Sequence, residues 1–557
     1  MTGRHGPGSA RAARAGTVWW AAGAVAALGL ATAGTASAQR GASNLYADPA
    51  SATAPQAVQS GSNPPTGPVV VVRDDATPPL VEAAKHRQPA RALSLIDHGA
   101  DVNATAPDGT TALMWAVHYD EVPVIDRLIA AHANVRAIND FGATSMSQAA
   151  IFGDTAVIEK LVKAGADVES ANAGGQTALM ILARTDNVDA ARFLIRHGAN
   201  VNARENWLGQ TALDWAAARS EPEMVRLLLR YHANPNLRSY FNTDQRQITS
   251  EPRIQGRPTG GFTPLIFAAR EGCIACAKNL VEGGADINMT DPDGETPLLI
   301  ATENFHFDLA AYLLEKGANP NRWDWWGRTP LYAAVDLDTL PYGGRPDRIS
   351  LDKTSDLELI ELLLVAGANP NAQLKLLPPY RAIADRGRDA MLTTGATPLL
   401  RAAKADDTAA IRLLLAHGAN VSLPNRDGDT PLMAAAGLDS TDADTRGKYK
   451  TQQDAVESVG LLLAAGAGVN QVDGRGETAL FGAASWGWND VIAYLVSHHA
   501  DLSARDRRGM TPIDAALGRA TRRARGSPNV HRDTANLLRQ LTTASPTTAP
   551  HSPNRPL

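Results

Sequence analysis

The fold of this protein is decided by residues 291–321, which read DPDGETPLLIATENFHFDLAAYLLEKGANPN. After an Asp-Gly turn, Thr296 and Pro297 are typical of a helix start, because proline has a preset φ and needs no N–H at the first helical position. Apolar residues at helical spacing in 307–316 predict a second helix. Gly317 follows a lysine-bearing last turn and is typical of a left-handed C-cap. The stretch therefore predicts a turn and two short helices.

Two helices this short cannot cover their own apolar faces, so the unit is stable only if copies stack against it. Matching turns and helix starts recur along the chain, each with a glycine followed two residues later by threonine. These glycines are Gly109, Gly142, Gly175, Gly209, Gly261, Gly294, Gly327, Gly395, Gly428, Gly476 and Gly509. Where nothing is inserted, the period is about 33 residues.

The unit resembles the ankyrin repeat, which is two antiparallel helices and a hairpin finger. Thr-Pro-Leu starts, Ala-Ala pairs, Leu-rich second helices and Gly-Ala-Asp/Asn-x-Asn ends recur in register over most of the chain. One copy has Ser145-Met146 in place of Pro-Leu. The resemblance implies an all-α ankyrin-repeat solenoid of about eleven to twelve helix-turn-helix units over residues 77–541. It also implies a concave binding face made by the fingers and the first helices.

The composition agrees with closely packed small helices, and the net charge bears on whether the protein could bind nucleic acid. Only 5% of the residues are aromatic, and a solenoid adds length without enlarging its core. The formal net charge of −5 is small for 557 residues. A basic field over the whole surface is therefore excluded, and we expect no nucleic acid partner.

The N-terminus has the three parts of a secretory signal peptide. Arginines precede an apolar run from Val18 to about Ala31, and Ala36-Ser37-Ala38 is a small-x-small cleavage site. The alternative is an uncleaved single-pass anchor facing outside the cytoplasm, for which the run is short. We expect residues 1–38 to be a cleaved signal peptide and the mature protein to be periplasmic or secreted.

Two segments flank the predicted repeats without a helical period. Residues 39–76 are rich in Ala, Ser, Gly and Pro and are predicted to be a disordered linker. Residues 542–557 are rich in Thr, Ser and Pro and are predicted to be a disordered tail.

Four insertions interrupt the period. Residues 237–260 and 372–394 fall between the end of one repeat and the start of the next, so they should enlarge fingers. Residues 336–356 and 437–453 fall between the two helices of a repeat, at the other end of the unit. Loops of this length are either tolerated insertions or functional sites.

No motif for catalysis or phosphate binding is present, so we expect no enzymatic activity and no cofactor. Histidines recur at or just before the glycine that ends the second helix. They are His98, His132, His197, His232, His417 and His499. Equivalent positions in neighbouring repeats lie about 8–10 Å apart, whereas zinc ligands lie about 2 Å from the ion. We therefore expect no metal site, and a role at helix C-termini accounts for these residues.

Cys273 and Cys276 form the chain's C-x-x-C pair. Three interpretations remain open, in this order: buried packing of the thiols, a disulfide, and a redox pair. Haem attachment is excluded because Ala277 follows where histidine is required. A zinc site is not expected either, because the two cysteines would supply only half of its four ligands.

One finger has an unusual composition for a turn that faces solvent. Residues 322–328 read RWDWWGR and contain three of the ten tryptophans. Tryptophan and arginine are the residues most enriched in binding hot spots, whereas the alternative is that the indoles pack on a neighbouring finger or loop. The predicted partner-binding residues are Trp323, Trp325, Trp326, Arg328, and Tyr380, Arg381 and Arg386 of the insertion at 372–394.

The sequence thus predicts an extracytoplasmic scaffold that binds another protein through its concave face. One alternative is a chaperone or inhibitor of a cell-envelope enzyme. Another is a carbohydrate or small-ligand binder that uses exposed tryptophans. Contact with a membrane is expected only if the N-terminal segment stays uncleaved.

Overall fold

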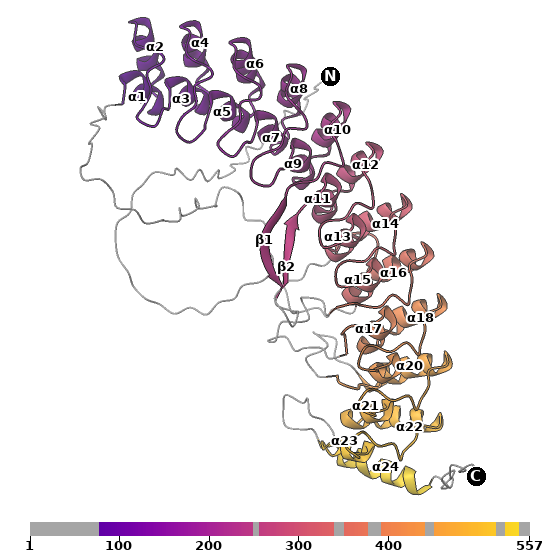
Figure 1. Cartoon of the computed structure of the whole chain (residues 1–557). Coiled ribbons are helices and arrows are strands. Elements are labelled where there is room, and N and C mark those ends of the chain that lie inside the picture. The colour runs from indigo at the N-terminus through magenta and orange to yellow at the C-terminus, as the bar shows by residue number, and fades with distance from the viewer. Residues whose placement is uncertain are drawn as a thin grey trace, which may run out of the picture. The chain divides into compact units, whose positions relative to one another are not determined.

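The computed structural model describes residues 77–248, 255–338, 350–376, 391–440, 451–519 and 530–544 (Figure 1). Within these ranges the chain forms 24 helices that follow one another in pairs, and one two-stranded hairpin. The expected all-α repeat solenoid is confirmed. The predicted leader at 1–38 and the predicted linker at 39–76 lie outside the described residues.

The first helices of the pairs are α1 (Pro79–Lys85), α3 (Ala112–His118), α5 (Ser145–Phe152), α7 (Ala178–Ala183), α9 (Ala212–Ala218), α11 (Pro264–Glu271), α13 (Pro297–Glu303), α15 (Pro330–Asp338), α17 (Pro398–Ala405), α19 (Pro431–Ala435), α21 (Ala479–Trp486) and α23 (Pro512–Ala516). The second helices are α2 (Pro89–Asp97), α4 (Val122–Ala130), α6 (Thr155–Lys163), α8 (Val188–Arg196), α10 (Pro222–Arg230), α12 (Ile274–Glu282), α14 (Phe307–Glu315), α16 (Asp356–Val365), α18 (Thr408–Ala416), α20 (Gln452–Ala464), α22 (Asn489–Ser497) and α24 (Arg532–Ala544).

The threonine of the repeated motif starts the first helices, as its position predicts. In α13, Thr296 is the N-cap, and its hydroxyl accepts a hydrogen bond from the N–H of Leu299 at 3.2 Å. Pro297 occupies the next position, where no N–H is needed. This cap satisfies an N–H that the helix itself leaves without a partner. An exception is Thr478 before α21, which makes no side-chain cap.

The helices stack in two layers. Each first helix packs on the first helix of the next unit, and from α2 to α22 each second helix packs on the next second helix. The core between the layers is rich in alanine and leucine, such as Ala268, Ala269 and Leu280, all fully buried. Small residues allow the close approach that so short a repeat requires.

The asparagines at the ends of the repeats connect consecutive units. The side-chain oxygen of Asn288 accepts the backbone N–H of Asn319 at 2.8 Å, and that of Asn321 accepts the N–H of Asn369 at 2.7 Å. The same bond joins Asn371 to Asn420. The Gly-Ala-Asn-x-Asn pattern is therefore explained by a hydrogen bond between repeats, which a single unit cannot show.

Fingers carry the first and second insertions where the sequence places them. The insertion at 237–260 contains the antiparallel strands β1 (Phe241–Ile248) and β2 (Gln255–Gly260), which extend one finger (Figure 1). The described part of the second insertion, residues 372–376 and 391–394, continues the finger after α16. The other two insertions separate α15 from α16 and α19 from α20, as expected.

The histidines near the ends of the second helices have the local role that was expected. His132, His232 and His499 have φ of 62°, 66° and 68°, so they occupy the left-handed position that glycine fills elsewhere. His98 and His197 hydrogen-bond through Nδ1 to the carbonyl four residues earlier, at 2.7 and 2.9 Å. Each imidazole thus shares the carbonyl that also accepts the backbone N–H of the same histidine.

Cys273 and Cys276 form a disulfide at the start of α12. Cys276 is fully buried, and its N–H also donates to the sulfur of Cys273, the N-cap residue, at 3.1 Å. Of the three interpretations, the disulfide is the one the structure contains. It replaces the preferred assignment of two packed thiols, although the burial of Cys276 agrees with that assignment.

The C-terminal boundary needs a small correction. Helix α24 continues to Ala544, beyond the predicted end of the repeat domain at 541. The remainder of the predicted tail lies outside the described residues. In the described part of the chain, no helix is long and apolar enough to cross a membrane.

Candidate functional site

The predicted tryptophan finger separates into exposed and buried side chains. Trp323 is 49% exposed and Trp325 is 36% exposed, whereas Trp326 is 1% exposed and Arg328 is also buried. The burial corrects part of the prediction, because Trp326 and Arg328 have no surface to offer a partner. Tyr380, Arg381 and Arg386 lie outside the described residues.

Trp326 lies between the next finger and Arg328, whose guanidinium carbon is 5.2 Å from the centroid of the Trp326 ring. The backbone N–H groups of Lys375 and Leu376 donate to the carbonyl of Trp326 at 2.8 and 3.1 Å. Phe141 occupies the equivalent turn position in an earlier repeat and remains 61% exposed, and the finger after it has Ala173 and Gly174 at its turn. Phe141 and Trp326 thus occupy the same position in their repeats but differ in burial, because the residues of the following finger are different.

A pocket of about 480 Å³ opens beside Trp323, between its finger and the following one. We call it the Trp323 pocket, and its lining residues are Asn321, Trp323, Gly327, Thr329, Asn369, Ala372, Gln373 and Lys375. The ammonium of Lys375 lies 2.9 Å from the centroid of the Trp323 ring. The pocket therefore combines one exposed indole with one cation.

The amides that line the Trp323 pocket are engaged within the repeats. Asn321 accepts the N–H of Asn369, and the Nε2 of Gln373 donates to the carbonyls of Gly395 and Pro424 at 2.9 and 3.0 Å. A bound group would consequently meet mainly the Trp323 ring and the Lys375 ammonium.

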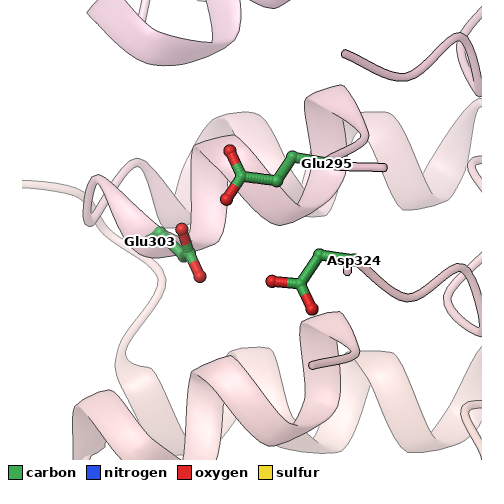
Figure 2. A group of neighbouring side chains, drawn as sticks. All are labelled: Glu295, Glu303 and Asp324. Carbon is green, nitrogen blue, oxygen red and sulfur yellow. The ribbon is translucent and has the colours of Figure 1, made fainter. Parts of the chain in front are cut away.

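Beneath this finger lies a group of three carboxylates around one guanidinium, which we call the Arg328 cluster. Figure 2 shows the carboxylates of Glu295, Glu303 and Asp324 directed toward one another. Arg328 contacts all three, with Nη2 3.0 Å from Glu295, Nε 2.6 Å from Asp324, and Nη1 paired with Glu303. Asp324 has no exposed side-chain surface, and about a fifth to a quarter remains for Glu295 and Glu303.

One guanidinium cannot balance three ionised carboxylates in such a place. Burial raises the pKa of Glu303 to about 7, although Arg328 opposes the shift. Burial and the charge of Glu303 raise the pKa of Glu295 well above its usual value, and burial raises that of Asp324. Near neutral pH the cluster therefore holds protons as well as Arg328.

The same three carboxylates have the spacing of a possible metal site. Their oxygens lie within 4.8 Å of one another, a spacing that one cation can bridge. Arg328 pairs with each of them, so the guanidinium supplies the positive charge at their centre. We assign the group as a structural ion-pair cluster and assign no metal to it.

The raised pKa values predict how stability changes with pH. Because the folded carboxyls bind protons more tightly than unfolded ones, the free energy of unfolding should fall as pH rises from about 4.5 to about 7. Glu477 contributes in the same direction, since burial raises its pKa to about 7. Thermal melts between pH 5 and pH 8 should show a decreasing Tm.

Glu303→Gln tests the origin of this effect, because glutamine imitates the protonated side chain at every pH. The variant should show a flatter decline of Tm between pH 5 and 8 than the parent protein. Glu315→Gln is the matched control, since Glu315 is a solvent-facing glutamate of the next helix. Equal slopes for the parent and E303Q would contradict the assignment to the Arg328 cluster.

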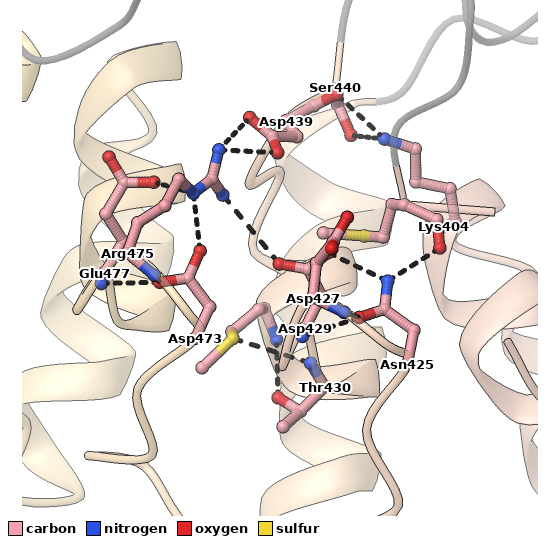
Figure 3. A network of polar contacts seen from close by, with 12 residues as sticks. Lys404, Asn425, Asp427, Asp429, Thr430, Asp439, Ser440, Asp473, Arg475 and Glu477 are labelled. Carbon is pink, nitrogen blue, oxygen red and sulfur yellow. Dashed lines mark hydrogen bonds and ion pairs between the residues drawn. The ribbon is translucent and has the colours of Figure 1, made fainter. Parts of the chain in front are cut away.

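A second polar network surrounds Arg475 (Figure 3). Its Nη1 lies 2.8 Å from Asp439, and its Nε lies 2.7 Å from Asp473 and 3.0 Å from Glu477. Lys404 donates to the hydroxyl of Ser440 at 3.0 Å, beside the insertion that precedes α20. The network ties α17, α19 and the finger before α21 together, so its geometry is structural.

Sequence reasoning missed that exposed aromatic side chains recur on other fingers. Phe141, Trp207, Tyr240 and Phe241 are 61%, 66%, 42% and 55% exposed. Phe141 and Trp207 lie at turns, whereas Tyr240 and Phe241 lie where β1 begins, and Tyr240 lies across Gly209, where a Cβ would sit 2.5 Å from the tyrosine ring. A signal was available for Phe141 and Trp207, because they lie within two positions of the turn glycines Gly142 and Gly209.

Neighbouring turns hydrogen-bond to one another through the backbone. The N–H of Asn206 donates to Gly174, and that of Trp325 donates to Asp293, at 2.9 and 2.7 Å. We call the line of turns the finger-tip row. The exposed aromatic residues, Trp323 and Trp325 included, therefore lie along one edge of the solenoid.

Comparison with protein families finds a match to the model for ankyrin repeats in three copies. The matched residues are 80–172, 146–239, 265–341, 350–443 and 449–538. Comparison with curated proteins finds no match.

Proposed function

Because the chain belongs to the ankyrin repeat family, whose repeats are generally protein-protein interaction modules, we propose that it is an exported scaffold. It binds another protein through the fingers and first helices, and Trp323 and Trp325 contribute most of the affinity. Repeats of this family typically form binding scaffolds without catalysis, and no enzymatic activity is proposed here.

The observation that carries this proposal is the exposure of large aromatic side chains on the finger-tip row. An indole that is half exposed costs free energy in water unless something covers it. Trp323 and Trp325 belong to a single finger, and Trp323 lines the Trp323 pocket. Aromatic anchors beside a pocket are the usual centre of a protein interface.

Two features support export. The first is the arginine-flanked apolar segment that ends at Ala38. The second is the Cys273–Cys276 disulfide, a bond that persists mainly in oxidising compartments. The mass of the mature protein tests this part, since cleavage after Ala38 would make Gln39 the first residue.

Alanine at Trp323 or Trp325 should weaken partner capture. Loss of one hot-spot tryptophan typically costs about 2 kcal/mol or more, roughly a thirtyfold loss in affinity. The measurement is crosslinking of the native protein in its cell envelope, followed by titration of the captured partner with each variant. The helical circular dichroism of both variants should equal that of the parent.

Phe152→Ala is a matched control, because Phe152 is also 49% exposed but lies at the end of α5, between the two helices of its repeat. It should leave affinity unchanged. If both tryptophan variants bind as tightly as the parent, the partner site lies elsewhere on the solenoid.

The Trp323 pocket also favours a second candidate, a binder of carbohydrates or small ligands, since a flat exposed indole can stack on a sugar ring. Competition for partner capture by soluble sugars would support it. A third candidate is a chaperone or inhibitor of an envelope enzyme, with the β1–β2 hairpin reaching into that enzyme. In that case the activity of the captured enzyme would change when the scaffold is removed.

A further inference from the structure

The C-terminal half of the finger-tip row carries exposed cations. Arg322, Lys375, Arg426 and Arg507 are exposed. Arg426 and Arg507 lie in the turns 425–428 and 506–509, Arg322 lies two residues before the turn 324–327, and Lys375 hydrogen-bonds to that turn. None of the four pairs with a carboxylate among the residues that the structure describes. The fold does not require a cation at these positions, because the place of Arg426 is filled by Asp140, Ala173 and Pro292 in earlier fingers.

Backbone hydrogen bonds between the turns keep these cations in line. The N–H of Lys375 donates to Trp326, that of Arg426 to Thr394, and that of Arg507 to Arg475, each at 2.8 Å. Between the last two, the N–H of Gly474 donates to Asp427 at 2.7 Å. Repeats pack about 8–10 Å apart, which is close to the Debye length of about 8 Å at physiological salt. Salt therefore screens much of the interaction between the charges of neighbouring turns, so each cation acts mainly on a group that lies directly against it.

The acidic residues of the same turns do not neutralise this field at the surface. Asp324, Asp473 and Asp506 are buried at the base of their turns. Asp473 accepts the N–H groups of Arg475 and Glu477, both at 2.8 Å, and Asp506 accepts those of Arg508 and Met510, both at 2.8 Å.

The buried carboxylates also pair with cations of their own turns. Arg475 lies 2.7 Å from Asp473, and Arg508 lies 2.8 Å from Asp506. The four cations that pair with no carboxylate, of which Lys375 lies over the Trp323 ring, are therefore additional to these pairs. In the turns 324–327, 425–428, 473–476 and 506–509, the exposed carboxylate is that of Asp427.

The basic character is local. The whole chain has a net charge of −5, and the earlier turns carry exposed aromatic residues with little exposed charge. At the turn 206–208, for example, Asn206 and Trp207 are exposed, while Glu205 is buried and accepts the N–H of Trp207 at 2.7 Å. Trp323 and Trp325 lie where the aromatic part of the row meets the basic part.

We infer that the partner is a protein with an acidic segment, and that this segment lies along the finger-tip row from Arg322 to Arg507. An apolar side chain next to the acidic segment would enter the Trp323 pocket. This inference rests on the proposed function and adds the chemistry of the partner. Complementary charge raises the association rate and selects among partners more than it raises affinity.

The arrangement favours protein over nucleic acid. Proteins that bind single strands interleave aromatic side chains with cations, so that bases stack while phosphates pair. Here the exposed tryptophans lie at one end of the cations, and the remaining surface carries net negative charge, which repels a polyanion that extends beyond the row.

The test uses the full mature chain and three polyanionic probes at matched charge concentration. They are a poly-glutamate peptide, a single-stranded DNA oligonucleotide and phosphatidylglycerol vesicles. Poly-glutamate should bind the parent, and its affinity should fall as salt increases. Replacing Arg322, Lys375, Arg426 and Arg507 together by serine should lower that affinity by about two- to fivefold per cation.

The control removes the same number of cations from exposed positions on second helices, namely Lys163, Arg196, Arg226 and Arg230. It should bind poly-glutamate about as well as the parent, apart from the common change in net charge. If poly-glutamate fails to bind the parent, or binds the row variant as well as this control, the inference is overturned. Tighter binding of DNA or of vesicles than of poly-glutamate would also overturn it.

Failure here is distinguishable from failure of the proposed function. Suppose a captured partner is lost from the Trp323 and Trp325 variants but is unaffected by salt and by the four serine substitutions. The scaffold function then stands, and only the acidic nature of the partner is rejected.

Discussion

Replacing Arg328 with alanine is expected to lower the free energy of unfolding by about 3–5 kcal/mol, the range for removing one member of a buried ion pair. The substitution leaves three carboxylates that face one another without their common cation. Urea denaturation measures the loss. Hydrogen exchange of α13 and α15 should localise it, because a repeat stack unfolds with coupling mainly between neighbours.

Arg328→Lys separates charge from geometry. Lysine keeps the positive charge, but a single ammonium cannot reproduce the planar fork that reaches all three carboxylates. The free energy of unfolding of R328K should therefore lie between that of the parent and that of R328A. The R328A defect should also be larger at pH 8 than at pH 5, because the carboxyls are protonated at the lower pH. An R328A protein as stable as the parent at pH 8 would contradict this account.

Trp326→Ala is expected to cost a similar amount, about 3–5 kcal/mol, because it removes a large buried side chain and leaves a cavity. Trp326 is the largest of the fully buried side chains in the described residues. The loss should appear as a lower midpoint in urea, with increased hydrogen exchange in the fingers on either side of residue 326.

Trp325→Ala is the matched control, since it removes the same side chain from the adjacent position of the same finger. Trp325 is 36% exposed, so its loss should lower the free energy of unfolding by less than the loss of Trp326 does. The two variants should therefore have opposite profiles, with W326A unstable and W325A stable but weak in partner capture. Equal losses of stability would show that both indoles support the fold.

Most of the fold could be predicted because its signals are local. Thr296 and Pro297 specify a helix start through bonds to residues only three positions away, and Gly317 ends the unit with a positive φ. The expected second helix at 307–316 became α14, Phe307–Glu315. Repetition then gives the architecture, because units that cannot bury their own apolar faces must stack.

The Arg328 cluster was not predicted, although its signal was present. Glu295 and Arg328 occupy the same place in consecutive repeats, directly after the turn glycine, and opposite charges at that place should meet across the interface. Sequence comparison within the repeats could have suggested this pair. Glu303 and Asp324 could be recognised as members only from the tertiary structure, because the packing of helix against finger brings them to Arg328. The excess of carboxylates over cations therefore could not be predicted either.

The amino-acid sequence by itself determined the repeats, their register and the positions of all four insertions, because caps, turns and apolar spacing act within one repeat. Only the tertiary structure decided which tryptophan of 322–328 faces solvent and which is buried. The reason is that burial depends on surrounding residues: the next finger hydrogen-bonds to the carbonyl of Trp326 and Arg328 lies over its ring, while Trp323 and Trp325 remain at the edge. The candidate binding surface is consequently a property of adjacent repeats and of no single one.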